Sequence, residues 1–132
     1  IKEESMSPAL LPDDYVLAIK NKESLSRGDI VIFKNYEKNI DVVKRVIGLP
    51  GETVGSENGK VLINNTEIDD IWAKTLTDDF IPQTLGEEEV FVLGDQRRLS
   101  SSDSRTLGPI PMKDCWKLKY RYWPYQRFKA YE

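Results

Sequence analysis

Short apolar runs with the spacing of strands dominate this sequence. Residues 15–20 alternate apolar and less apolar positions, and residues 30–33 and 90–93 are continuous apolar runs of the kind found in buried strands. Residues 116–123 alternate aromatic and basic side chains as a single strand. Helical periodicity is not sustained over any long stretch. The pattern therefore predicts an all-β fold built from antiparallel sheets.

Turn signals separate the predicted strands. Asn58-Gly59 predicts a two-residue hairpin, Asn64-Asn65 predicts a second tight turn, and the Gly-Leu-Pro-Gly sequence at 48–51 ends a strand. Residues 66–89 are polar and acidic with only weak periodicity. We therefore expect a β core formed by residues 1–54 and 90–132, with residues 55–89 forming a small hairpin or flap lobe.

Composition narrows the possible chemistry. The chain has 132 residues, a formal net charge of −3, one cysteine and no histidine, which suits one domain. Without histidine there is no Ser-His-Asp triad and no histidine metal site, and Cys115 alone forms neither a disulfide nor a thiolate cluster. We expect no metal and no cofactor. The acidic balance also disfavours a nucleic-acid partner, so the basic and aromatic run at 117–122 is interpreted as an amphipathic strand.

A serine in such a chain needs another base, and lysine is one known substitute for histidine. A lysine accepts a proton only when it is neutral, so its pKa must fall from about 10.4, and burial among apolar side chains lowers it. Lys44 follows Val42-Val43 and precedes Val46-Ile47, which supply such surroundings. Because neighbours on a strand point to opposite faces, Lys44 is expected to face inward while Arg45 faces outward.

Five segments of the chain, in order, resemble the type I signal peptidases, which are membrane-anchored Ser–Lys proteases that remove signal peptides from exported proteins. The spacing of Ser5 and Lys44 and the aromatic closing segment are similar to those of Gram-positive members. The five segments are Ser5-Met6-x-Pro8-x-Leu10, Arg27-Gly28-Asp29-Ile30-Val31, Lys44-Arg45-x-x-Gly48-x-Pro50-Gly51, Gly94-Asp95-x-Arg97 with Ser101-x-Asp103-Ser104-Arg105, and Tyr120-Arg121-Tyr122-Trp123-Pro124.

The resemblance implies a role for each matching residue. Ser5 would be the nucleophile, and its backbone N–H would be one donor to the oxyanion. Lys44 would be the general base. Ser101 would hydrogen-bond the Lys44 amine, and an ion pair between Asp103 and Arg105 would fix the supporting loop.

The resemblance also implies how the substrate binds. Met6, Leu10, Val42 and Val43 would line a shallow apolar cleft that accepts small side chains. The signal peptide of an exported preprotein would bind there in an extended conformation and pair with a strand edge, which is β-augmentation. A single-pass membrane anchor upstream of Ile1 would hold the catalytic domain on the extracytoplasmic face of the cell membrane.

Several positions depart from the family pattern. Ala9 stands where the family usually has Thr, and Glu3 stands where many members have Ser or Gly. Gln96 replaces the common Asn. The stretch from Gly94 to Arg105 is one residue longer than usual, so Ser100 and Ser102 remain alternatives to Ser101.

Two other functions remain open. One is a non-catalytic, signal-peptidase-like factor that binds peptides in pilus assembly, because some relatives encoded beside pilus genes have lost the catalytic pair. The other is a self-cleaving repressor-type domain, which also uses a Ser–Lys dyad. Since Ser5 and Lys44 are both present, we favour an active signal peptidase.

Overall fold

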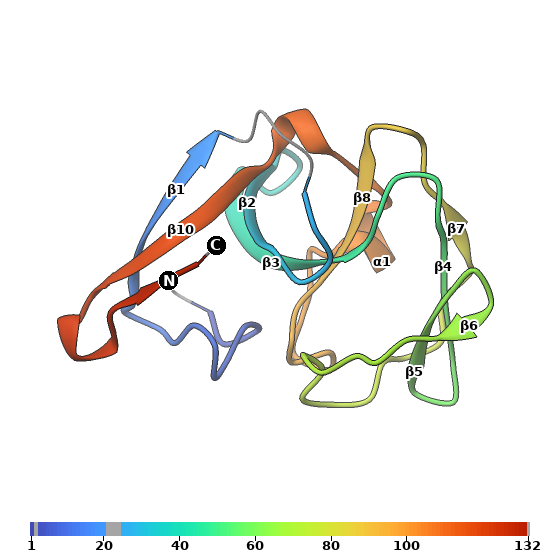
Figure 1. The fold of residues 1–132 in the computed structure, drawn as a ribbon, viewed down its shortest axis with the longest axis horizontal. Helices are drawn as coiled ribbons and strands as arrows, with labels where there is room; N and C mark the ends of the chain where they lie inside the picture. Colours follow the sequence, from blue (N-terminus) through green and yellow to red (C-terminus); the bar gives the residue numbers. More distant parts are fainter. Residues whose placement is uncertain (2, 21–24, 132) are drawn as a thin grey trace.

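The larger part of the molecule is a seven-stranded antiparallel sheet. The structure is a computed structural model, and it describes residues 1, 3–20 and 25–131. The strands run in the order β1-β10-β2-β3-β8-β9, with β11 paired to β10; Figure 1 shows β1 and β10 side by side at one end of the molecule. The strands are β1 (Tyr15–Lys20), β2 (Ile30–Asn35), β3 (Ile40–Gly48), β8 (Glu89–Leu93), β9 (Ile110–Pro111), β10 (Trp116–Trp123) and β11 (Lys129–Ala130).

A smaller four-stranded sheet lies at the other end of the molecule, in the order β6-β5-β4-β7 (Figure 1). Asn58 and Gly59 join β4 to β5 with φ values of 55° and 82°, and Asn64 and Asn65 join β5 to β6 with φ values of 50° and 70°. Positive φ at both central positions defines the type I′ hairpin turn, so both predicted turns are confirmed. The strands are β4 (Thr53–Glu57), β5 (Lys60–Ile63), β6 (Thr66–Glu67) and β7 (Gln83–Thr84).

The all-β prediction is confirmed, and the remaining regular elements are short. They are helix α1 (Ser104–Leu107) and the 3-10 turns η1 (Met112–Asp114) and η2 (Tyr125–Arg127). The Asp103 side chain caps α1 by accepting from the Arg105 N–H. None of the helices in the described part of the chain is long and apolar enough to cross a membrane. The small sheet begins at Thr53, within the range that the sequence assigned to the core, and the division at 54/55 stays a prediction.

Strands β3 and β8 are covered on both faces. Val46 and Val92 pack into one apolar cluster, whereas Ile47 and Phe91 pack into a second cluster beneath the small sheet. Successive side chains on a strand point to opposite faces, so both faces of β3 and β8 are enclosed. This explains why Arg45, which was expected to face outward, is instead buried at 9% exposure on the face opposite Lys44.

Candidate active site

Ser5 and Lys44 meet although 39 residues separate them. Lys44 lies near the middle of β3 and is 0% exposed, while Ser5 lies in the turn-rich segment before β1 and is 5% exposed. Lys44 Nζ is 3.0 Å from Ser5 Oγ, which is hydrogen-bond distance. The Ser5 hydroxyl and the Lys44 amine are therefore in direct contact.

The surroundings of Lys44 favour its neutral form. Burial lowers the pKa of the Lys44 amine, because removing an ammonium from water is unfavourable. The negative charges of Asp103 and Glu3 oppose that effect and raise the pKa, while the positive charge of Arg105 lowers it further. The sum is a pKa below the ordinary value for lysine. A neutral amine of this kind can accept a proton from a hydroxyl.

Ser100 holds the Lys44 amine on its other side. Ser100 Oγ lies 3.1 Å from Lys44 Nζ and 2.7 Å from Asp103 Oδ2. A hydroxyl has a single proton, and an ionised carboxylate only accepts, so Ser100 donates to Asp103 and must accept from Lys44. With one N–H committed to Ser100, the amine is oriented so that its lone pair can face the Ser5 hydroxyl.

The contact expected of Ser101 is thus made by Ser100, and Ser101 is exposed. The backbone explains the difference, because the N–H groups of Leu99 and Ser100 both donate to the carbonyl of Gln96 and form a tight turn. That turn brings Ser100 back beside β8, where its Oγ accepts from the Gly94 N–H at 3.2 Å. Ser102 is buried but bonds to Asn35, not to Lys44.

Asp103 and Arg105 form the ion pair that the sequence predicted for this loop. Arg105 Nη2 lies 2.8 Å from Asp103 Oδ2, and the same nitrogen donates to the carbonyls of Arg97 and Ser100. The guanidinium therefore fastens three points of the loop. Because Asp103 also accepts from Ser100, the ion pair fixes the group that orients Lys44.

Two residues whose role the sequence did not indicate hold Ser5 against the same loop. The Gln96 N–H donates to the Ser5 carbonyl at 2.8 Å, and Gln96 Nε2 donates to the Ser7 carbonyl at 3.0 Å. Gly94 permits this close approach, because a Cβ at that position would lie 2.4 Å from Ser100 Oγ and 3.0 Å from the Ser5 carbonyl oxygen. The sequence indicates only that Gln96 stands where the family commonly has Asn.

A groove of about 340 Å³ runs beside Ser5. Met6, Val42 and Val43 line it, as the sequence predicted. Leu10 does not, because it is fully buried and packs in an apolar cluster with Ile30 and Leu118. Beyond the predicted residues, the groove is lined by further apolar side chains and by two carboxylates; these lining residues are Ile1, Val16, Ile32, Ile40, Glu3 and Asp41.

Two ion pairs, one buried and one partly buried, connect the supporting loop to its surroundings. Arg45 pairs with Asp95 through contacts of 3.0 and 2.8 Å, and burial raises the pKa of Asp95 although Arg45 opposes that shift. Arg97 pairs with Asp70 through contacts of 2.8 and 3.1 Å and also donates to the Gly94 carbonyl. Asp70 belongs to the segment between β6 and β7, so Arg97 links the small lobe to the loop that carries Ser100.

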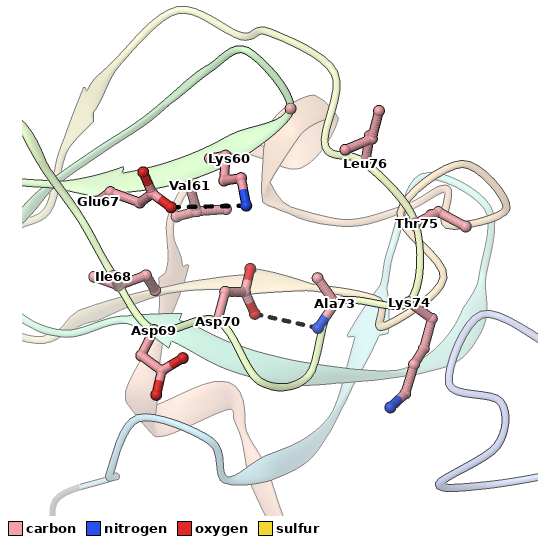
Figure 2. A pocket seen from close by; sticks show the side chains of 11 residues that line it. Lys60, Val61, Glu67, Ile68, Asp69, Asp70, Ala73, Lys74, Thr75 and Leu76 are labelled. Carbon is pink, nitrogen blue, oxygen red and sulfur yellow. Dashed lines mark hydrogen bonds and ion pairs between the residues drawn. The ribbon is translucent and has the colours of Figure 1, made fainter.

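The same segment borders a pocket of about 440 Å³ on the small lobe. Figure 2 shows the side chains of Asp69 and Asp70 leaving the segment in different directions. Within the described residues, no group of three or more His, Cys, Asp or Glu side chains is arranged to hold a metal ion. Cys115 is fully buried and burial raises its pKa to about 12, which keeps it a thiol at neutral pH.

Comparison with known proteins agrees with the fold. The sequence profile of the family described as "Signal peptidase, peptidase S26" matches residues 1–123. Since this match covers nearly all of the chain, the protein belongs to the signal peptidase family and is a peptidase by class.

Individual relatives carry the same name. Signal peptidase I of Bacillus caldolyticus is 35% identical over 149 residues, which cover 97% of this chain and 80% of the relative. Signal peptidase I of Streptococcus pneumoniae (strain ATCC BAA-255 / R6) is 30% identical over 173 residues, with 99% and 84% covered. The crystal structure of a signal peptidase I from Enterococcus faecalis V583 superimposes with a TM-score of 0.61 at 30% identity, covering 72% of this chain and 96% of that chain.

Proposed function

We propose that this protein is a serine endopeptidase that uses a Ser5–Lys44 dyad to cleave signal peptides from exported preproteins after small residues. The observation that carries the proposal is the 3.0 Å contact between Ser5 Oγ and a fully buried Lys44 Nζ. Membership of the signal peptidase family supports the choice of substrate.

The reaction follows from the contacts of the dyad. Lys44 takes the proton of Ser5 as Ser5 Oγ attacks the carbonyl carbon of the scissile bond, and the Ser5 N–H stabilises the oxyanion that forms. The Lys44 ammonium then protonates the leaving amine, and the signal peptide stays as an ester on Ser5. Lys44 next takes a proton from water as the water oxygen attacks the ester carbon. The bond to Ser5 Oγ then breaks, Lys44 returns the proton to Ser5 Oγ, and the signal peptide leaves as an acid. Throughout, Ser100 keeps the amine directed at Ser5.

The groove supports selection for small residues. The groove that borders Ser5 is lined mostly by apolar side chains, including Met6, Val42 and Val43. In our proposal the signal peptide lies extended along this groove and forms main-chain hydrogen bonds with an exposed strand edge beside it. The peptide side chains that face the groove then contact its apolar lining.

The exposed apolar and aromatic side chains of β1 and β10 support a function at a membrane surface. Tyr and Trp side chains are enriched where proteins meet the lipid headgroups. We place the domain on the extracytoplasmic face of the cell membrane, held by a single-pass anchor as in the type I signal peptidases. The exposed apolar and aromatic residues of the two strands are Tyr15, Leu17, Ile19, Trp116, Tyr120, Tyr122 and Trp123.

A cleavage assay tests the proposal. The full-length, membrane-bound protein is mixed with a lipid-embedded preprotein, and the products are identified by mass spectrometry. One cut after a small residue is expected, and it should disappear in both Ser5→Ala and Lys44→Ala. Its rate should rise with pH as Lys44 loses its proton.

The specific observation that favours a second function is Glu3, a carboxylate on the groove beside Ser5, where it would repel a developing oxyanion. If the wild type binds the preprotein but leaves it uncut, just like Ser5→Ala and Lys44→Ala, the protein is instead a peptide-binding factor of the kind that acts in pilus assembly.

A further inference from the structure

A second pocket, of about 300 Å³, lies at the other end of the nucleophile segment. Its walls include Pro8 and Ala9 of that segment, with Ile71 and Trp72 from the small lobe. Its charged lining is strongly unbalanced, with five cations and one carboxylate, although the whole chain carries a net charge of −3. We call it the basic pocket; its charged residues are Arg45, Lys74, Arg121, Arg127, Lys129 and Asp95.

Three of the cations have no carboxylate partner among the described residues. Asp95 is bound by Arg45, and Arg127 is bound by Asp14 through contacts of 3.0 and 2.9 Å. Arg121, in contrast, donates to the carbonyls of Ala9 and Arg127. Lys74 and Lys129 are exposed, and neither forms an ion pair with the part of the chain that the structure describes.

The backbone ties the basic pocket to the nucleophile. The Lys74 N–H donates to the Asp95 carbonyl at 2.9 Å, and the next residue, Gln96, donates to the Ser5 carbonyl at 2.8 Å. Lys74 also borders the pocket that Asp69 and Asp70 line on the small lobe (Figure 2). Two consecutive loop residues therefore make these contacts: Asp95 binds the backbone of Lys74, and Gln96 binds the backbone of Ser5.

The position of the basic pocket relative to the groove suggests its ligand. The groove borders Ser5 and Met6, whereas the basic pocket borders Pro8 and Ala9. A peptide that fills the groove with the residues before the cut must continue beyond Ser5. Ser5 on the groove and Ala9 on the basic pocket are four residues apart, and four residues span at most about 14 Å even when fully extended. The pocket is therefore within reach of the first few peptide residues after the cut.

We propose that the basic pocket binds acidic side chains in the first few residues downstream of the scissile bond, and so selects preproteins whose mature part begins with Asp or Glu. This inference rests on the proposed peptidase function. Carboxylates would pair with Lys74, Lys129 and the guanidinium of Arg121 at the rim, where such pairs are screened by salt. The selectivity is therefore greatest at low ionic strength.

The first test compares two peptides with the same residues before the cut. One carries Glu at the second to fifth positions after the cut, and the other carries Gln there. The Glu peptide is expected to have a KM about fivefold lower, with kcat unchanged, and the difference should disappear at high salt. Equal KM values for the two peptides at low salt overturn the proposal.

Charge reversal identifies the residues responsible. Lys74→Glu and Lys129→Glu should each remove the preference for the Glu peptide. Lys113→Glu, on the exposed turn η1, makes the same charge change away from the basic pocket and should leave the preference intact. If Lys113→Glu removes the preference as well, the effect comes from net charge and the proposal is wrong.

A binding measurement separates this inference from the peptidase proposal. The probes are fluorescent peptides that represent only the downstream half, with a free N-terminus, and their affinity is read by anisotropy without any cleavage. Tighter binding of the Glu peptide, lost in Lys74→Glu, supports the pocket even in a protein that cuts nothing. Equal affinities for the Glu and Gln peptides, with phosphatidylglycerol vesicles bound through Lys74 and Lys129, identify a lipid-headgroup site and overturn the proposal.

Discussion

The backbone N–H of Gln96 donates a 2.8 Å hydrogen bond to the carbonyl of Ser5. Four residues later, Ser100 Oγ lies 3.1 Å from Lys44 Nζ. One loop after β8 therefore positions both the proposed nucleophile and the proposed base. Its own shape is fixed by the ion pair between Asp103 and Arg105.

Replacing Ser100 by Ala should lower kcat about 100-fold and leave KM nearly unchanged, because the Lys44 amine loses the partner that orients it. Ser101→Ala is the matched control, since Ser101 is exposed and adjacent. Steady-state kinetics on a signal-peptide substrate measure both. A larger loss in Ser101→Ala than in Ser100→Ala would contradict the assignment of Ser100 as the partner of Lys44.

Lys44→Met should make the protein more stable at neutral pH, because burial lowers the pKa of Lys44 in the folded state and an ammonium there is disfavoured. Between that lowered pKa and the unfolded value of about 10.4, the unfolded chain binds more protons, so the wild-type free energy of unfolding rises with pH. The advantage of Lys44→Met should therefore shrink as the pH approaches 10. Urea unfolding of both proteins from pH 7 to pH 10 measures the difference in their free energies of unfolding. If that difference does not change with pH, Lys44 has the same pKa in the folded and unfolded states.

Glu3→Gln should shift the rise of activity to lower pH, because the Glu3 charge raises the pKa of Lys44. It should also increase turnover a few-fold at neutral pH, since a carboxylate on the groove opposes the oxyanion. The neighbouring Glu4 is exposed and does not line the groove, so Glu4→Gln serves as control. A pH–rate profile that is the same for Glu3→Gln and the wild type would mean that Lys44 does not sense Glu3.

Asp70→Ala should destabilise the protein by about 3 kcal/mol, because it leaves the fully buried guanidinium of Arg97 without its carboxylate. Asp69→Ala changes an exposed neighbour and should alter the free energy of unfolding by less than about 0.5 kcal/mol. Chemical denaturation compares the two variants. Equal losses would indicate that the segment, not the ion pair, determines stability.

Local features of the fold could be predicted from the sequence. The alternation of residues 15–20 and the Asn58-Gly59 turn depend on neighbouring residues alone, and both appear as predicted. Ser5 and Lys44 could be proposed together because their order and spacing resemble a known family. Leu10 was misassigned to the cleft because an apolar residue beside a nucleophile can equally fill a core.

The contacts that refine the site depend on the path of the chain. Whether Ser100 or Ser101 reaches Lys44 is decided by the turn that closes on the Gln96 carbonyl, and a one-residue difference in loop length leaves both possible in the sequence. Arg97 and Asp70 are 27 residues apart and come from different lobes. The sequence around each of these two residues gives no indication that they form an ion pair.

The complete burial of Lys44 has a consequence for chemical probes and inhibitors. Its amine is 0% exposed, whereas Lys113 and Lys129 are open to solvent. An electrophile that enters by the groove meets the Ser5 hydroxyl first, and Ser5 stands between it and the amine. Reagents that label lysines in general will therefore spare Lys44, and covalent inhibitors of this protein have to be designed for the serine.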